Sequence, residues 1–166
     1  MTIYHPNSSG TGSAIRLELH PAHDDIAGSI MATIATQLTT GNCMGSMLVY
    51  PRFDWDGAIT VKLDFTDISK MLQVFLGECE SLEDGRGLFH KSPRGTTKII
   101  LRHIVEPING YMLEVSRKTV SRKTSDSKDS NARIFLSPYE ALGLATAIES
   151  SMGVICFGIP MVNTNV

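Results

Sequence analysis

The sequence predicts an α+β domain in which antiparallel strands are followed by an amphipathic helix, and this succession occurs twice. Several segments alternate apolar and polar residues with the period of a half-buried strand, and two others place apolar residues at helical spacing. A third observation is size, because 166 residues with 42% apolar side chains are enough for one domain with a sizeable core.

Four segments of the first half are predicted strands. AIRLELH at 14–20 and AITVKLDF at 58–65 alternate apolar and polar side chains. AGSIMATIATQL at 27–38 is rich in β-branched residues and alternates as well, although its small residues leave a helix as the alternative. MLVYPRF at 47–53 is a short strand that Pro51 stops.

The period changes to that of a helix in segment 66–78. Its apolar residues at helical spacing are Ile68, Met71, Leu72, Phe75 and Leu76. Thr66 or Asp67 is the predicted N-cap, and Gly77 is the predicted end. The acidic segment 78–86 is expected to be a loop.

The second half begins with two predicted strands, 96–105 and 110–119, joined by a turn at residues 107–110. Segment 121–131 contains no apolar residue, so we expect an exposed and mobile loop there. A last short strand is predicted at 132–136.

A helix start is encoded at residues 137–140. Ser137 is the predicted cap, Pro138 takes the first helical position, and Glu140 completes a capping box. The helix that follows is apolar over more than one face, so we expect it to bury against its own sheet and against a neighbour. A plain core helix is the alternative.

The chain divides into a flexible polar arm at 1–13, a folded domain at 14–160 and a tail at 161–166. No secretory signal is expected, and no run approaches the roughly 18 apolar residues of a membrane span. Three widely spaced cysteines suit reduced thiols in a cytosolic compartment. A cytoplasmic location without a membrane partner is therefore the prediction.

Charge is distributed unevenly along the chain. Segment 86–133 contains eleven Lys and Arg against four Asp and Glu, so it carries +7 while the remainder carries −9 of the total of −2. Such polarity indicates an anionic partner on one face. The alternative is a solvated basic surface with acidic neighbours folded across it.

Five stretches, taken in order, resemble the Whirly family. They are GSIMATIATQ (28–37), RFDWDGAITVKLDFTDISKML (52–72), GLFHKS (87–92), GYMLEVSRK (110–118) and RIFLSPYEALGLATAIESSMGVICFG (133–158). The resemblance runs from about residue 14 to 159. No single stretch is highly specific, and the ordered series carries the resemblance.

The resemblance implies two four-stranded antiparallel sheets packed crosswise, each half followed by a helix. It also implies a tetramer formed through the helices, and binding of single-stranded DNA with little sequence preference. Related folds occur in kinetoplastid RNA-binding proteins. The family's Lys-Gly-Lys-Ala-Ala-Leu motif is missing, since this chain has SAIRLELHP at 13–21, which puts assembly beyond the tetramer in doubt. The missing plant transit peptide favours a bacterial or phage relative.

Single-strand binding needs cations that follow phosphates and rings on which bases stack. Lys98 and Arg102 lie four residues apart in one predicted strand, so they share a face, with Ile100 between them. The candidate nucleic-acid-binding residues are Arg52, Trp55, Lys62, Phe89, His90, Lys91, Arg94, Lys98, Arg102, Tyr111, Arg117, Lys118, Arg122 and Lys123. Core packing is the alternative for the rings, and contact with another protomer is the alternative for Trp55.

Other chemistry has weak signals. His20 and His23, followed by Asp24 and Asp25, have a spacing that could hold a divalent ion, but a solvated turn after Pro21 explains them as well. No nucleophile motif and no phosphate-binding loop is present. We therefore expect neither an enzyme nor a metal or cofactor.

The sequence thus predicts a non-catalytic single-stranded DNA-binding homotetramer that serves replication, recombination, repair or transcription. Two alternatives stay open. One is an RNA-binding protein of the same fold, and the other is a scaffold protein whose basic face binds an acidic protein partner.

Overall fold

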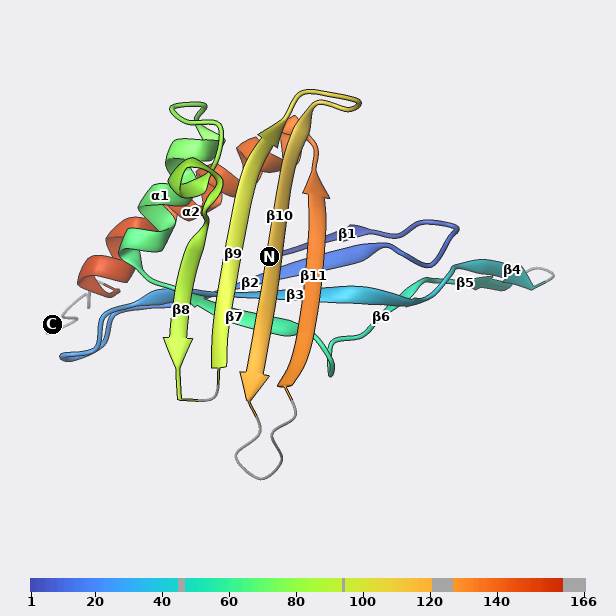
Figure 1. The fold of residues 1–166 in the computed structure, drawn as a ribbon, viewed down its shortest axis with the longest axis horizontal. Helices are drawn as coiled ribbons and strands as arrows, with labels where there is room; N and C mark the ends of the chain where they lie inside the picture. Colours follow the sequence, from blue (N-terminus) through green and yellow to red (C-terminus); the bar gives the residue numbers. More distant parts are fainter. Residues whose placement is uncertain (45–46, 94, 121–126, 160–166) are drawn as a thin grey trace, which may run out of the picture.

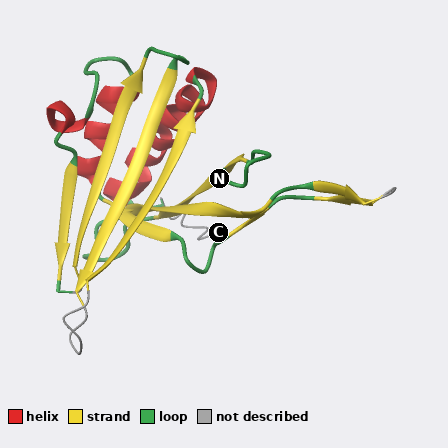
Figure 2. Cartoon of the chain, turned by 45° about the vertical axis from the view of Figure 1, so that its right-hand side comes forward, coloured by secondary structure: helices red, strands yellow, loops and turns green. Residues whose placement is uncertain are grey.

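The computed structural model (Figure 1) describes residues 1–44, 47–93, 95–120 and 127–159. Two antiparallel sheets cross each other, and the two helices lie together against one side of the second sheet (Figure 2). The predicted α+β class with two crossed antiparallel sheets is confirmed.

The first sheet consists of five strand segments in four positions. They are β1 (Thr2–His5), β2 (Ser13–His20), β3 (Ser29–Thr39), β6 (Arg52–Phe53) and β7 (Ile59–Leu63). The order is β1-β2-β3, and both β6 and β7 pair with β3, one near each end of it. Ile15, Ile34 and Ile59 pair across β2, β3 and β7, so an apolar row crosses the sheet.

The second sheet has four strands. They are β8 (Leu88–Ser92), β9 (Gly95–Ile104), β10 (Gly110–Val120) and β11 (Ser127–Leu136). The order β11-β10-β9-β8 follows the chain through successive antiparallel neighbours. Ile99, Val115 and Ala132 pair across the sheet and face the first sheet and the helices.

A separate hairpin of β4 (Asn42–Met44) and β5 (Met47–Val49) extends away from the body of the molecule (Figure 1). Leu48 and Tyr50 are exposed on and beside it.

Helix α1 (Phe65–Phe75) follows the first sheet, and a short 3₁₀ turn, η1 (Leu82–Gly85), follows the helix. Asp64 is the N-cap, because its carboxylate accepts a 2.9 Å hydrogen bond from the Asp67 N–H. The Asp67 carboxylate in turn accepts from the Asp64 N–H at 3.2 Å. The prediction of Thr66 or Asp67 as cap is therefore wrong, since Asp67 closes a capping box from inside the helix. The predicted end is confirmed by Gly77, whose φ is +77°.

Helix α2 (Pro138–Phe157) begins as predicted. Glu140 accepts from the Ser137 N–H at 2.9 Å, and Ser137 caps in return. The other carboxylate oxygen of Glu140 lies 2.9 Å from Nε2 of His5, which joins β1 to this helix. Burial raises the pKa of Glu140, but the hydrogen bonds from Ser137 and the neighbouring His5 outweigh it and hold the pKa below its usual range.

Helix α2 is also long and apolar enough to cross a membrane, judged by length and composition alone. This is weak evidence, because core helices of soluble proteins share the property.

One apolar core joins the inner faces of both sheets to the two helices. Ile34 of β3, Leu101 of β9, Ile68 of α1 and Ile148 of α2 are each at most 1% exposed within it. Each sheet therefore has one face that is fixed against the core, and its other side chains point outward.

Several segments differ from the sequence prediction, among them β8, for which no strand was predicted. Residues 2–5, placed in a flexible arm, form β1 because they pair along β2. Residues 127–131, placed in a mobile loop, belong to β11 because they pair with β10. The single strand predicted at 47–53 is two strands, β5 and β6, with Pro51 between them. The tail at 161–166 lies outside the described residues.

Replacing Glu140 with Gln should lower the free energy of unfolding by about 0.5–1 kcal/mol at pH 7, because a neutral amide loses the negative charge that is favourable at the helix N-terminus and that strengthens the hydrogen bond from Ser137. Because the folded-state pKa is lowered, the carboxylate contributes stability that is fully present above the ordinary value of about 4.3. That contribution should be lost as the pH falls through the lowered value. Urea unfolding at pH 7 and near pH 4 measures it, with Glu149→Gln, exposed on the same helix, as the control. An equal loss in both variants at pH 7 would contradict the capping role.

Candidate nucleic-acid interface

Strand alternation divides the predicted site residues of the second sheet between two faces. The outer face, away from the core, carries Phe89, Lys91, Lys98, Arg102 and Lys118. The inner face carries His90, Tyr111 and Arg117. The structure confirms that Lys98 and Arg102 share a face with Ile100, but it does not form one surface from the whole set.

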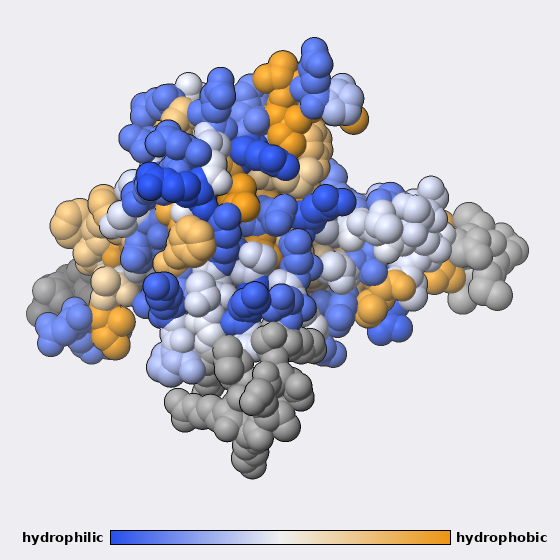
Figure 3. All heavy atoms as spheres, in the orientation of Figure 1, coloured by the Kyte–Doolittle hydropathy of each residue, from blue (hydrophilic) through white to orange (hydrophobic). Residues whose placement is uncertain are grey.

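The outer face combines cations with an exposed ring. Phe89 on β8 is 55% exposed and pairs with Lys98 on β9, whose Nζ lies 5.4 Å from the ring centroid. This is a cation–π contact between neighbouring strands. Figure 3 faces this side and shows hydrophilic side chains over most of it, with apolar ones between them.

Beside this pair lies a hollow of about 400 Å³, here named the outer hollow. It is lined by Thr96, Lys98, Ser116, Arg117, Lys118, Asp129, Ser130 and Asn131. Lys118 is 67% exposed and lies 3.9 Å from the Asp129 carboxylate, a distance at which an exposed pair holds only weakly. The hollow therefore offers two ammonium groups together with hydroxyl and amide groups to a ligand.

Positive charge prevails on the outer face. Its described charged residues are the cations Lys91, Lys98, Arg102, Lys118 and Arg133 and the acids Glu114 and Asp129. Such a surplus attracts anions.

One part of the inner face of the second sheet is not covered by the first sheet. There the second sheet and β7 form a groove. This groove, here named the inter-sheet groove, measures about 340 Å³ and is lined by Thr60, Val61, Lys62, His90, Ser92, Gly95, Thr97, Arg117 and Thr119. Arg117 fixes its geometry, because its guanidinium donates to the Thr60 carbonyl of β7 and, at 3.2 Å, to the Thr97 hydroxyl of β9. The predicted candidate Lys62 is exposed at the same groove.

His90 is held in place rather than free. Its Nε2 lies 3.0 Å from the carboxylate of Asp67, which is also the capping-box residue of α1. The position of the ring is therefore tied to the start of the helix. Sequence reasoning missed Asp67, because nothing in the chain signals a contact across 23 positions.

Tyr111 packs inward. Its ring centroid lies 5.4 Å from that of Phe75 and 4.9 Å from that of His103, and its hydroxyl donates to the Phe75 carbonyl at 3.3 Å. This placement agrees with the core-packing alternative for this ring.

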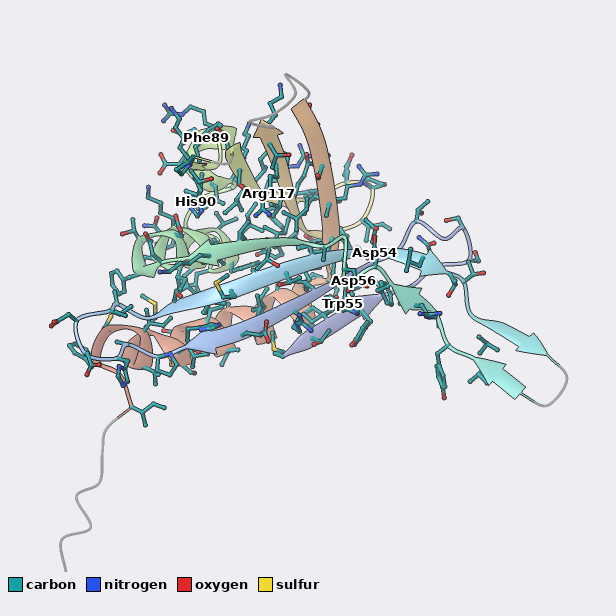
Figure 4. All side chains as sticks on the ribbon, turned by 90° about the horizontal axis from the view of Figure 1, so that it is seen from below. Asp54, Trp55, Asp56, Phe89, His90 and Arg117 are labelled. Atoms are coloured by element: carbon teal, nitrogen blue, oxygen red, sulfur yellow. The ribbon has the colours of Figure 1, made fainter. Side chains whose placement is uncertain are left out.

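Trp55 lies in the turn between β6 and β7 of the first sheet, away from Phe89 and His90 (Figure 4). Arg16 lies 5.0 Å over its ring, and Tyr4 meets it edge-on at 6.4 Å. Sequence reasoning missed both partners. Tyr4 was placed in the flexible arm, and nothing in the chain signals that Arg16 of β2 meets a ring 39 positions away. Arg52, on β6, is exposed.

Three candidates, Arg94, Arg122 and Lys123, lie outside the described residues. Within the described part of the chain, no three His, Cys, Asp or Glu side chains gather as metal ligands would. His23 and Asp24 form an exposed pair at 2.7 Å.

No family model and no curated protein sequence matches the chain, whereas solved structures do match it. WHY3 from Arabidopsis thaliana has a TM-score of 0.64 and 15% identity, covering 92% of this chain and 88% of that one. The plant transcriptional regulator PBF-2 has a TM-score of 0.61 and 16% identity, covering 93% and 80%. WHY1 from Arabidopsis thaliana has a TM-score of 0.60 and 15% identity, covering 95% and 86%.

The fold is Whirly-like. At this identity the likeness shows the fold alone, and the interface described above rests on this chain's own residues. These neighbours are plant proteins, and the bacterial or phage origin expected from the sequence has no support among them.

Adjacent residues on opposite faces allow a matched test of the groove. Arg117→Met should lower the free energy of unfolding by about 1.5–3 kcal/mol, because it removes the hydrogen bond of a charged group that joins the two sheets, together with the bond to Thr97 within the second sheet. Lys118→Met, one position on and exposed, should change it by no more than about 0.5 kcal/mol. Urea unfolding of both variants measures the difference, and equal losses would show that Arg117 does not join the sheets.

Proposed function

We propose that the protein is a non-catalytic single-stranded DNA-binding protein with little sequence preference. One observation carries the proposal: the exposed Phe89 ring, with Lys98 over it, lies beside the outer hollow and its second ammonium group, Lys118. Rings that stack bases and cations that follow the phosphates are the two requirements of single-strand binding.

The interactions that this site offers, stacking and contacts with phosphates, do not depend on the base sequence. Every base has a π-face, so stacking on Phe89 contributes about 1–3 kcal/mol per base whatever the base is. Ammonium groups recognise phosphates as point charges and read no sequence. Positions for direct base readout are not needed for this kind of binding.

The Whirly-like fold supports the proposal, since one structural neighbour is described as a transcriptional regulator. Replication, recombination, repair and transcription are the processes that such binding would serve. Exposed free Cys79 and Cys156 are compatible with the reducing cytoplasm in which we place the protein.

Lys98→Ala should weaken binding of labelled oligo(dT) and reduce the slope of log affinity against log salt by about 0.7, the contribution of one phosphate contact on a single strand. Fluorescence anisotropy over a salt series measures both quantities. Thr40→Glu is the control, because it makes the same change in net charge at an exposed site outside both surfaces. An unchanged slope in Lys98→Ala would remove the outer face from the binding site.

Competitors in the same titration separate the alternatives. Equal competition by DNA and RNA would mean that the 2′-hydroxyl is not read, whereas stronger competition by RNA would favour the RNA-binding alternative. Absence of oligonucleotide binding by the wild-type chain at low salt would overturn the proposal in favour of the protein scaffold.

We further propose a homo-oligomer assembled through the helices, with a tetramer as the expected form. Helix α2 leaves large apolar side chains uncovered, with Leu142 63% and Phe157 89% exposed. Gly143 follows Leu142 in the helix, and a Cβ built there would meet nothing within 4 Å. Uncovered apolar side chains next to a glycine suit close approach of a second helix.

Leu142→Lys should therefore lower the molar mass in solution, because assembly would bury the new charge. Size-exclusion chromatography with light scattering measures the mass. Leu48→Lys on β5 is the matched control, since Leu48 is similarly exposed at 57% but lies on the hairpin. A monomeric wild-type chain, or a Leu142→Lys chain of unchanged mass, would contradict assembly through α2.

A further inference from the structure

Strand β8 is the edge of the second sheet and separates the outer face from the inter-sheet groove. Its residues alternate between these surfaces, with Phe89 and Lys91 turned outward and His90 turned to the groove. With five residues, β8 is also the shortest strand of its sheet. A ligand that passed from one surface to the other would therefore have only one short strand to cross.

A third hollow lies over this edge. The edge hollow, as we name it, measures about 350 Å³ and is lined by Asp67, Lys70, Glu83, Arg86, Gly87, Leu88, Phe89 and His90. It brings together side chains from α1, from η1 and its flank, and from β8. Two neighbouring residues of β8, Phe89 and His90, thus point to opposite faces and line the same hollow.

A side-chain contact links the outer hollow to the edge hollow, and a shared residue links the edge hollow to the inter-sheet groove. Phe89 lines the edge hollow and contacts Lys98, which lines the outer hollow. His90 lines both the edge hollow and the inter-sheet groove. Figure 4 shows Phe89 and His90 close together, with Arg117 beyond them. A path therefore runs from the outer face, around β8, to Arg117.

Lys and Arg side chains line each part of this path. Lys98 and Lys118 lie at its start, Lys70 and Arg86 at the edge, and Lys62 at its end, while Arg117 lines both the outer hollow and the inter-sheet groove.

Acidic side chains on the path are paired with bases. Glu83 lies 2.5 Å from Lys70 and 3.9 Å from Arg86, and Asp67 is bound to His90. The Lys70 contact lowers the pKa of Glu83 and the same pair raises the pKa of Lys70, so both groups are charged and offset each other. Among the residues that the structure describes, no acid lines the groove end, which offers hydroxyl groups from Thr60 and Thr97.

We propose that one nucleic-acid strand wraps around β8, with bases stacked at Phe89 on the outer face and with its phosphates continuing into the inter-sheet groove. This inference rests on the proposed function and adds the path of the strand. The two surfaces then act as linked sites for one ligand, so the second contact is intramolecular and strengthens binding without a new partner. Short oligonucleotides engage only the outer face, and longer ones reach the groove.

The test compares oligo(dT) of about 4 and about 16 nucleotides, which bracket the usual length held by one small single-strand-binding domain. Anisotropy titrations use the wild-type chain, Lys62→Ala at the groove, Lys98→Ala on the outer face, and Thr40→Glu as the control for charge. Lys62→Ala should weaken binding of the long oligonucleotide tenfold or more and leave that of the short one unchanged. Lys98→Ala should weaken binding of both, and Thr40→Glu of neither.

Each other outcome has a definite meaning. An unchanged affinity of Lys62→Ala for the long oligonucleotide would overturn the wrapped path but leave outer-face binding intact. Two long strands per chain, counted by native mass spectrometry, would also overturn it, because the surfaces would then hold separate strands. Failure of the wild-type chain to bind either length would instead overturn the proposed function itself.

Discussion

The apolar contact between the inner faces of the two crossed sheets determines how the remaining surfaces are arranged. Ile34 and Leu101 are completely buried in it, one from each sheet. Because side chains alternate along a strand, burying these residues also fixes which neighbours point away from the core. A shift of one residue in β9 would send Lys98 into the core and Ile99 to solvent. Burying an unpaired ammonium group is costly. The register that keeps Ile99 in the core therefore also keeps Lys98 on the outer face.

The parts of the fold that local sequence determines were predictable. Ser137, Pro138 and Glu140 start a helix through contacts within four residues, and segment 58–65 alternates because one strand face meets the core. Strand β1 and the polar half of β11 were not predictable, because long-range pairing with β2 and β10 forms them. Polar residues in a strand carry no periodic signal when neither face is fully buried. Asp64 was missed as a cap because the alternating pattern continues through it to Phe65.

The sequence prediction named residues on both candidate surfaces but did not separate the two surfaces. Lys98, Lys118 and Phe89 share the outer face, whereas Arg117 and His90, their neighbours in sequence, face the groove. Alternation alone could have separated Arg117 from Lys118. What no pattern in one sequence could supply is the contact of Arg117 with Thr60 or that of His90 with Asp67, since each joins elements far apart in the chain. These contacts turn a basic segment into two distinct surfaces.

An open sheet edge exposes unpaired backbone groups and invites pairing with another chain. In β8 that hazard is limited, because the strand is short and carries Lys91 and His90, and η1 and α1 contribute side chains to the hollow over it. The same features suit a polyanion, since it can bend around a short charged edge but cannot add a strand to it. Protection of the edge and the proposed guidance of a nucleic-acid strand would thus both follow from one arrangement. His90 points inward because Asp67 holds its ring there. The groove side of β8 is therefore polar, which suits a polyanion that crosses this edge.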